Sequence, residues 1–412
     1  MNLADGKILS QRECGAVLDE LQARVAATLK KPALLPETVI AACDRLVKEL
    51  DEEYFLRRLG ELGIYDEMSR SYLAQAREAF CAEALWERLR LELGEDRKNI
   101  RPLGTLFHIA AGNADGLPVF SVLEGLLAGN INILKLPSAE GGLSAELLLR
   151  LIEAEPILAE YIYVFDYSSD DLVNIARLIA AADAVVVWGG DGAVSALRRA
   201  APPNTRIIEW GHKVSFGYVT PGGLTDDKLR GLARNIAETG QLLCSSCQGI
   251  FVDTDDLSEV HTFCERFLPI LEAETAKIPR CAEVGYLSAL TLELYTAELE
   301  APLTGSRVFR GKGCGLIAKP GGAAEAAPAT GAPWVKPLPR EEILTRLLPH
   351  KNHLQTVGML CGDGEAEALR ETFWRTGVVR CCAGGDMSRF SALLPHDGER
   401  PLRRYTKIVA AD

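Results

Sequence analysis

Residues 184–199 read AVVVWGGDGAVSALRR, and this stretch decides the fold class. A short apolar run rich in valine is typical of a strand that is buried on both faces. Two glycines follow it, and apolar residues then recur at intervals of three and four, as they do on one face of a helix. The stretch therefore predicts a strand, a glycine turn and a helix in succession.

The same succession extends along the chain on both sides of this stretch. From Ile100 onward, short β-branched runs alternate with amphipathic stretches. Strands that alternate with helices imply right-handed crossovers, and hence a parallel sheet that helices cover on both faces. Such a sheet binds ligands at the carboxyl ends of its strands. Further strands are predicted within residues 105–113, 130–138, 161–168, 206–211 and 216–222, and further helices within 116–129, 144–155 and 170–182.

The chain is long enough for more than one domain, at roughly 100–200 residues per domain. We expect residues 1–99 to be a helical lead-in and 100–211 to form a first α/β domain. Residues 212–395 are expected to form a second α/β domain, and 396–412 a C-terminal tail. A stretch rich in Gly, Ala and Pro, residues 319–334, is expected to be an exposed loop. In the second domain, helices are predicted at 225–240, 257–274, 341–350 and 365–377, and strands at 249–254, 353–360 and 378–384.

Composition excludes several classes of protein. The chain has 412 residues, 48% hydrophobic and 25% charged, so it can bury a large core. A formal net charge of −12 repels phosphate polymers, so we expect no nucleic-acid partner. Charges such as Glu124 and Asp183 cut every apolar run, so no membrane span is expected. The first residues do not resemble a signal peptide, and the eleven cysteines are scattered; we therefore expect a cytoplasmic protein with reduced thiols.

The most informative segment for chemistry is GQLLCSSCQGIFV, residues 240–252. A predicted helix ends at Gly240, and Cys244 lies on a short loop ahead of an apolar strand. A thiol that is held between two rigid elements is well placed to be a nucleophile, and a thiolate can take an acyl group from a thioester and release it again. The alternative is a small buried residue, since free cysteine is often buried.

Cys244 and Cys247 also form a C-x-x-C pair, which raises a redox and a metal interpretation. A thioredoxin-like pair follows a strand and opens a helix, whereas this pair follows a helix and precedes a strand. A structural zinc site needs two further Cys or His residues at compatible spacing, and none is nearby in the sequence. The motif therefore favours neither a redox pair nor a metal site.

Two features of the first domain could bind a dinucleotide. Gly189 and Gly190 lie at a strand-to-helix turn, where glycines let a pyrophosphate approach the start of a helix. The full G-x-G-x-x-G pattern is absent, and glycine is also common in ordinary turns. Lys135 ends another predicted strand, where its ammonium could reach cofactor ribose or phosphate oxygens, or could simply lie on the surface.

Two further polar residues follow predicted strands. Glu209, in RIIEWG, is expected at the carboxyl edge of the sheet together with Gly211, and its carboxylate could act as a general base or be solvated. Asn113 follows the strand at 105–110, and its amide could donate to a developing oxyanion. Asparagine is also a common helix cap, which is the more general explanation.

Taken in chain order, these landmarks resemble the aldehyde dehydrogenase superfamily. More closely, the chain resembles the acyl-CoA reductases of the LuxC family. That resemblance rests on CSSCQ at residues 244–248, HLQTVGM at 353–359 and PHDGERPLRR at 395–404, and it covers roughly the last three-quarters of the chain. It implies an aldehyde-dehydrogenase-like fold in which the first domain binds the cofactor and the second carries the nucleophile.

The resemblance also implies roles for single residues. Cys244 would be the acyl-accepting nucleophile, and Asn113 would be the side-chain half of an oxyanion hole that the Cys244 backbone N–H completes. Cys247 receives no catalytic role. The cofactor would be bound by Lys135, Pro137, Ser138, Gly189, Gly190 and Gly211, with the lysine at the adenosine ribose or its phosphate and the paired glycines beside the pyrophosphate.

Two departures from the hydrolytic aldehyde dehydrogenases bear on the cofactor and the reaction. Those enzymes usually carry an acidic residue three positions after the cofactor lysine, where this chain has Ser138. Without that carboxylate a 2′-phosphate is not repelled, which favours NADPH while leaving NADH possible. Their Glu-x-x-Phe-Gly-Pro stretch is also missing, so one contact with the cofactor ribose cannot be transferred.

The resemblance implies reduction of an acyl-CoA, including a long-chain fatty acyl-CoA, to the aldehyde with release of CoA. The alternatives are a hydrolytic NAD(P)-dependent aldehyde dehydrogenase, which Glu209 would favour, a catalytically silent scaffold, and a Cys244–Cys247 disulfide switch. Relatives oligomerise, so a homo-oligomer, either a dimer or a tetramer, is expected.

Overall fold

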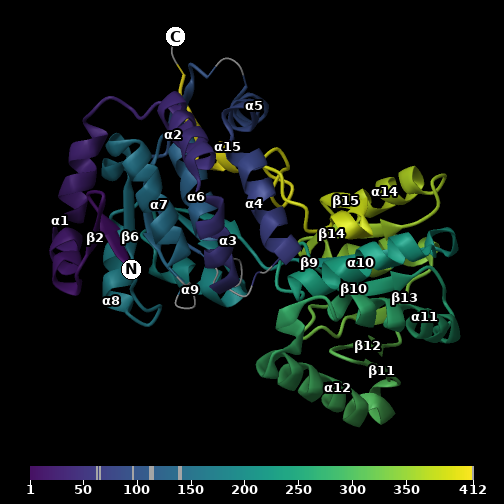
Figure 1. Ribbon diagram of the computed structural model, residues 1–412. Coiled ribbons are helices and arrows are strands. Elements are labelled where there is room, and N and C mark those ends of the chain that lie inside the picture. The colour runs from purple at the N-terminus through teal and green to yellow at the C-terminus, as the bar shows by residue number, and fades with distance from the viewer. Residues whose placement is uncertain (62–63, 65, 95–96, 111–115, 138–141, 411–412) are drawn as a thin grey trace. The chain divides into compact units, whose positions relative to one another are not determined.

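The computed structural model describes residues 1–61, 64, 66–94, 97–110, 116–137 and 142–410 (Figure 1). The chain divides into two compact units. The first unit comprises Met1–Gly211 and Phe390–Asp412, and the second comprises His212–Arg389. Residues 390–395, which were expected in the second domain, therefore lie with the first unit.

The first unit is built on a seven-stranded sheet with the order β2-β1-β6-β5-β4-β7-β8. Five adjacent strands of this sheet are parallel and confirm the strands that the sequence predicts in this part of the chain. They are β4 (Thr105–Ile109), β5 (Ile131–Lys135), β6 (Ile162–Phe165), β7 (Ala184–Trp188) and β8 (Arg206–Trp210). The strands are almost fully buried except β8, the edge strand, as expected for a parallel sheet that is covered on both faces.

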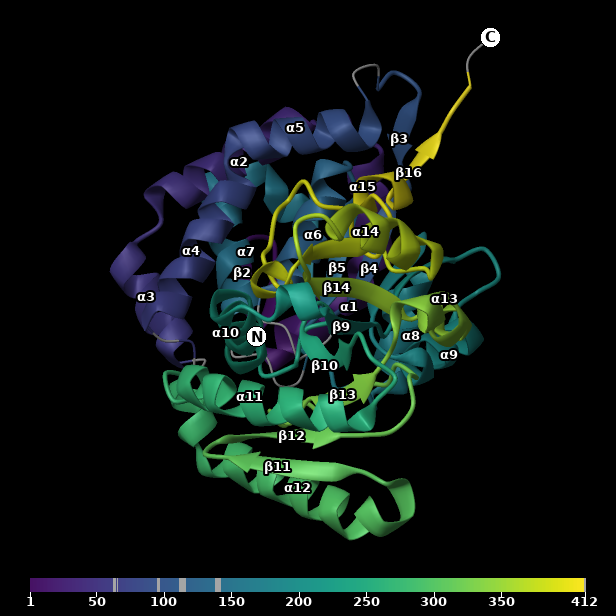
Figure 2. The same cartoon turned by 90° about the vertical axis from the view of Figure 1, so that its right-hand side faces the viewer.

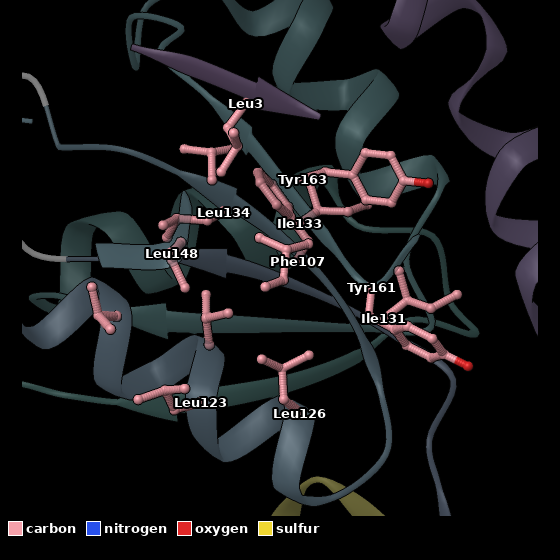
Figure 3. Packing of buried hydrophobic residues seen from close by; sticks show 14 of the residues in the cluster. Leu3, Phe107, Leu123, Leu126, Ile131, Ile133, Leu134, Leu148, Tyr161 and Tyr163 are labelled. Atoms are coloured by element: carbon pink, nitrogen blue, oxygen red, sulfur yellow. The ribbon is translucent and has the colours of Figure 1, made fainter. Parts of the chain in front are cut away.

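The predicted crossover helices are present as α6 (Leu117–Leu127), α7 (Leu143–Ala154), α8 (Leu172–Ala180) and α9 (Asp191–Ala200). Figure 3 shows how side chains from the strands, such as Phe107 and Ile133, pack against Leu123 and Leu126 of α6. All four are buried. This continuous apolar layer holds the strands, and hence their carboxyl ends, in fixed register.

The N-terminal region is not helical from its beginning. β1 (Asn2–Ala4) and β2 (Lys7–Leu9) form a hairpin, and β1 pairs antiparallel with β6. The turn residues Asp5 and Gly6 both have positive φ, 51° and 69°, as a tight two-residue hairpin requires. The expected helices then follow as α1 (Gln11–Leu29), α2 (Pro36–Glu49), α3 (Glu52–Glu61), α4 (Asp66–Phe80) and α5 (Ala82–Leu93).

The C-terminal residues, expected as a tail, belong to the packed body of the first unit. α15 (Pro401–Arg404) is followed by β16 (Thr406–Ile408), which pairs antiparallel with β3 (Ile100–Pro102). Leu402 and Tyr405 are fully buried. The backbone N–H of Leu402 donates to Glu92 of α5 at 2.8 Å. The end of the chain is therefore held against the helical lead-in.

The second unit has its own seven-stranded sheet, with the order β11-β12-β13-β10-β9-β14-β15 (Figure 2). Its parallel strands include three that the sequence predicts: β9 (Val214–Val219), β10 (Cys247–Val252) and β14 (Leu354–Leu360). The remaining strands are β11 (Arg307–Gly311), β12 (Cys314–Ala318), β13 (Trp334–Pro337) and the predicted β15 (Arg380–Ala383). The helices are α10 (Asp226–Thr239), α11 (Leu257–Thr275), α12 (Val284–Thr304), α13 (Ile343–Leu347) and α14 (Ala366–Arg375).

Candidate functional site

Cys244 lies on the loop between α10 and β10, as predicted, and is partly exposed. The helix ends at Gly240, whose φ of 54° places it in the left-handed region. A Cβ at this position would lie 2.3 Å from Nη2 of Arg280, so only glycine fits without rearrangement. Gln241 follows with a φ of 62°. Two successive left-handed residues turn the chain sharply from the helix into the cysteine loop.

Buried amide side chains hold the loop in this strained path. The Gln241 amide nitrogen donates to the backbone oxygens of Cys247 and Gln248, both at 3.2 Å. Its amide oxygen accepts from the backbone N–H of Gly331 at 3.1 Å. On the other side, the backbone N–H of Cys247 donates to the Asn235 side chain at 3.0 Å. These bonds offset the cost of the left-handed glutamine and fix both ends of the loop.

Residues at the amino ends of two other strands donate hydrogen bonds to Cys244, one to its sulfur and one to its carbonyl oxygen. Nε2 of Gln355, the second residue of β14, donates to Sγ of Cys244 at 3.2 Å. The Ser215 hydroxyl, on β9, donates to the Cys244 carbonyl oxygen at 2.6 Å and accepts from the backbone N–H of Thr356 at 3.0 Å. The sheet therefore positions the cysteine through β9, β10 and β14, which are adjacent.

Gln355 is a site residue to which the sequence analysis gives no role. Its motif, HLQTVGM, contributes to the family resemblance, but nothing in the sequence connects the glutamine with a cysteine that is 111 residues away. The available signal is a large polar residue in a mostly apolar strand that is buried along nearly its whole length. Such a residue must satisfy its amide internally, which is a reason to look for a partner.

Cys247, the other member of the C-x-x-C pair, has a different environment. It is fully buried in β10, and its thiol donates to the Gly249 carbonyl oxygen at 3.2 Å. Burial raises the pKa of this thiol to about 12, so it stays protonated and unreactive. All eleven cysteines are free thiols. Among the described residues, no cluster of three or more His, Cys, Asp or Glu side chains could hold a metal ion.

In the first unit, Lys135 ends β5 and is only 4% exposed. Its ammonium donates to the Ser169 hydroxyl at 2.9 Å, and burial lowers its pKa. The interpretation as a surface lysine is therefore wrong. Pro137, two residues further on, is buried as well. A partly desolvated ammonium at the carboxyl edge of a parallel sheet suits an anionic or hydroxyl-bearing ligand.

Gly189 and Gly190 follow β7, the strand next to β4. Chain order reverses between these two strands, because β5 and β6 lie on one side of β4 while β7 and β8 lie on the other. This is the switch point at which open parallel sheets bind ligands. Gly190 caps the start of α9, and a Cβ at this residue would have no atom within 4 Å. The residues present therefore fit a dinucleotide, whose phosphates could approach the backbone at this turn.

The sequence predicts that Glu209 follows its strand, but the structure places it within β8. Its carboxylate pairs with Arg198 of α9 at 2.6 Å and is 38% exposed. The Glu209 carbonyl oxygen accepts from Arg404 at 2.9 Å. Gly211 comes directly after the strand and has open space around it. Asn113 and Ser138 lie outside the described residues.

The carboxyl edge of the second sheet is closed by an ion-pair network. Nη2 of Arg340 contacts Glu365 at 2.6 Å and Asp253 at 2.7 Å. Glu365 also accepts from the Thr220 hydroxyl and from the backbone N–H of Gly362, both at 2.8 Å. These bonds lower the pKa of Glu365 to about 2. The network joins the ends of β9, β10 and β14 and leaves their polar groups satisfied.

The comparisons with known proteins agree on one family. A family model described as acyl-CoA reductase (LuxC) matches residues 33–408. A long-chain acyl-protein thioester reductase from Aliivibrio fischeri is 24% identical over 87% of this chain and 78% of its own length. One from Vibrio harveyi is 23% identical over 78% of this chain, and the chain spans 66% of the length of that relative.

Solved structures agree with the fold. An NAD-dependent aldehyde dehydrogenase from Sinorhizobium meliloti superposes with a TM-score of 0.71, covering 99% of this chain and 93% of that one at 13% identity. The chain therefore has the aldehyde-dehydrogenase-like fold that was predicted. Among the described residues, no helix is long and apolar enough to span a membrane.

Proposed function

Because the chain belongs to the acyl-CoA reductase (LuxC) family, we propose that it reduces an acyl thioester to the aldehyde with NADPH, through an acyl-enzyme on Cys244. The observation that carries the proposal is the Cys244 loop itself. Cys244 is partly exposed and is held by hydrogen bonds from two strands: Ser215 of β9 donates to its carbonyl oxygen, and Gln355 of β14 places an N–H donor at its sulfur. That arrangement is expected of a positioned nucleophile and is unnecessary for a packing residue.

In the first half-reaction, the Cys244 thiolate attacks the thioester carbonyl carbon. A carbon–sulfur bond forms to Cys244, and the carbonyl electron pair moves to the oxygen. When the carbonyl re-forms, the bond to the CoA sulfur breaks, and CoA leaves as a thiolate that takes up a proton from solvent. By resemblance, Asn113 and the Cys244 backbone N–H hold the oxyanion, which is the largest contribution that a protein usually makes to acyl transfer.

The residues proposed to hold the dinucleotide are in the first unit. Lys135 and Ser138 would bind the adenosine ribose and its 2′-phosphate, and Pro137 shapes the same strand end. Gly189 and Gly190 would admit the pyrophosphate, with Gly211 at the end of the neighbouring strand. Bound NADPH supplies a hydride to the acyl carbon.

Cys244, the nucleophile of the first half-reaction, is the leaving group of the second. The reduced carbon carries an oxygen and the Cys244 sulfur. An electron pair of that oxygen re-forms the carbonyl as the carbon–sulfur bond breaks, which releases the aldehyde and the Cys244 thiolate, and the thiolate takes up a proton from solvent. Hydride must arrive faster than water, because hydrolysis would release the free acid. Glu209 remains a candidate proton acceptor, available when its ion pair with Arg198 opens.

The thioester donor is proposed to be an acyl-CoA, including long-chain fatty acyl-CoAs. The name of the matching family supports acyl-CoA. A thioester carried on a protein is the second candidate, because the relatives are named long-chain acyl-protein thioester reductases. Both donors present the same carbonyl to Cys244 and differ only in the thiol that leaves.

The test is a series of acyl-CoAs of graded chain length, with NADPH consumption followed by absorbance and the aldehyde trapped and identified. We expect NADPH loss, free thiol and aldehyde to appear in equal amounts. NADPH-independent release of free acid as the sole product would overturn the proposal. Oxidation of an aldehyde with NADP in the absence of CoA would instead support the hydrolytic dehydrogenase.

We also propose that the protein forms a homo-oligomer, either a dimer or a tetramer. One side of α12 exposes apolar side chains, among them Leu292, Leu299 and Leu303. Exposed apolar surface of this kind is typical of a protein contact. Light scattering during size exclusion measures the mass directly, and a monomer at micromolar concentration would contradict the proposal.

A further inference from the structure

Gln355 is held so that its amide nitrogen, and not its amide oxygen, faces the sulfur of Cys244. The Gln355 backbone oxygen accepts from Val379 at 2.9 Å, which ties the residue to the adjoining segment. The Thr356 hydroxyl donates to the Gln355 amide oxygen at 3.5 Å. The side chain is 6% exposed, so few other orientations would satisfy it. Nε2 lies 3.2 Å from Sγ, within the range of a hydrogen bond to sulfur.

The other polar side chains around the loop already hold backbone groups. Ser215 donates to the Cys244 carbonyl oxygen, and Gln241 bridges β10 and Gly331. Gln248 donates to the Lys213 carbonyl oxygen and accepts from the Ala327 backbone. Of these side chains, Gln355 is the one whose donor contacts a reacting atom rather than the backbone.

We propose that Gln355 is a catalytic hydrogen-bond donor for Cys244, a role that rests on the proposed function. Its N–H stabilises the thiolate before attack. The carbonyl oxygen of a thioester is two bonds from the sulfur, so the same N–H reaches that oxygen once the acyl group is on Cys244. The donor is neutral in every step: the thiol loses its proton to solvent, the departing thiolate gains one, and Gln355 keeps both of its own.

A neutral amide also suits this position better than a carboxylate of the same shape. Glutamate at this position would place a negative charge against the thiolate and disfavour it. It could also accept a proton from water beside the acyl-enzyme, which would promote hydrolysis. Glutamine supplies the donor without either effect.

The test measures the pH dependence of Cys244 alkylation by iodoacetamide, with the modified peptide quantified by mass. Gln355→Met keeps the length of the side chain but removes the donor, so we expect the alkylation midpoint to move to higher pH. Gln355→Glu should move it further in the same direction. Gln248→Met is the matched control, since this amide is similarly buried and its hydrogen bonds go to the backbone of Lys213 and Ala327; its midpoint should equal that of the unmodified protein. Thermal unfolding of each variant checks that it folds.

The second readout is the rate of CoA release in a single turnover. Loss of an oxyanion donor typically slows acyl transfer about 100- to 1,000-fold, and we expect Gln355→Met to lie near the lower end of that range. If Gln355→Met does not fold, Gln355→Asn withdraws the amide by one methylene and gives the same readouts. An alkylation midpoint and a CoA release rate equal to those of the unmodified protein would overturn the proposal.

Alkylation needs neither acyl-CoA nor NADPH. If the unmodified protein reduces no thioester, the proposed function fails, whereas the response of the alkylation midpoint to Gln355 is still measured. The failures of the two proposals are therefore distinguishable.

Discussion

The two seven-stranded sheets place their candidate chemistry at opposite edges. In the first unit, Lys135 and the Gly189–Gly190 turn lie at the carboxyl ends of β5 and β7. In the second unit, Cys244 precedes β10, and Gln355 stands at the beginning of β14, so the proposed nucleophile lies at the amino edge.

The difference follows from what fills each carboxyl edge. In the second sheet, Arg340, Glu365 and Asp253 pair with one another across three strand ends. In the first sheet, the corresponding turn after β7 consists of glycines with open space around Gly190. Parallel sheets commonly bind ligands at their carboxyl edge, but ion-paired side chains can occupy that edge instead.

The largest effect is expected from Cys244→Ala, which removes the nucleophile from the amino edge. Loss of a covalent nucleophile should lower thioester reduction at least about a thousandfold. Cys247→Ala is the matched control, since this thiol is buried in the core and donates to a backbone carbonyl oxygen, and the variant should retain most of the activity. The measurement is NADPH consumption with acyl-CoA, and comparable loss in both variants would show that the loop matters only for folding.

Lys135→Met tests the carboxyl edge of the first sheet. Hydrogen bonds to charged groups contribute about 1.5–3 kcal/mol, so the KM for NADPH should rise by about 10- to 100-fold. Lys48→Met is the control, because Lys48 is exposed and pairs with Asp44 on its own helix. An unchanged KM in steady-state kinetics with Lys135→Met would contradict the assignment of this edge to the cofactor.

Gly190→Ala sharpens the same assignment, because the free protein has room for the added methyl group. The melting temperature should stay nearly unchanged, while dinucleotide affinity falls by about tenfold, on the order of 1.4 kcal/mol, if phosphates approach this backbone. Gly192 lies two residues further on, inside α9, and a Cβ there would also have free space. Gly192→Ala should therefore leave the affinity for the dinucleotide unchanged. Fluorescence titration with NADPH measures the affinity of each variant. Equal affinities for the two variants would place the phosphates elsewhere.

Glu365→Gln is expected to have the smallest effect on turnover and to act on stability alone. The folded-state pKa of about 2 lies below the ordinary value of 4.5. The carboxylate therefore stabilises the fold above pH 4.5, and this contribution is lost as the pH falls toward 2. Urea unfolding at pH 7 should show a loss of about 1–2 kcal/mol that disappears near pH 2. A large fall in kcat with unchanged stability would mean that this edge takes part in catalysis.

The parallel cores could be predicted because the central strands are short, mostly apolar runs rich in β-branched and aromatic residues, such as AVVVW in β7. The β1–β2 hairpin was missed, although Asp5-Gly6 is a hairpin signal, because its strands have three residues each and depend on pairing with β6. α12 was missed because its apolar residues occur on all sides, with Leu290 and Leu294 buried but Leu299 exposed. No periodicity distinguishes such a helix.

For the candidate site, the sequence placed Cys244 on the correct loop, since a helix end and an apolar strand bracket it. It could not find Gln355, because the contact with the sulfur is made across the sheet between segments far apart in the chain. The prediction for Glu209 was wrong because the strand does not end before this residue: Trp210, which follows it, is buried and continues the strand. Strand ends are set by pairing, which residue type alone does not determine.

The central claim is that Cys244 accepts the acyl group. Mixing the protein with an acyl-CoA in the absence of NADPH, followed by acid quenching and peptide mass analysis, tests it most directly. We predict that the peptide containing Cys244 gains the mass of the acyl group and that fragmentation places the group on this residue. An acyl group found on another side chain, or full reduction with no adduct at any time, would contradict the account.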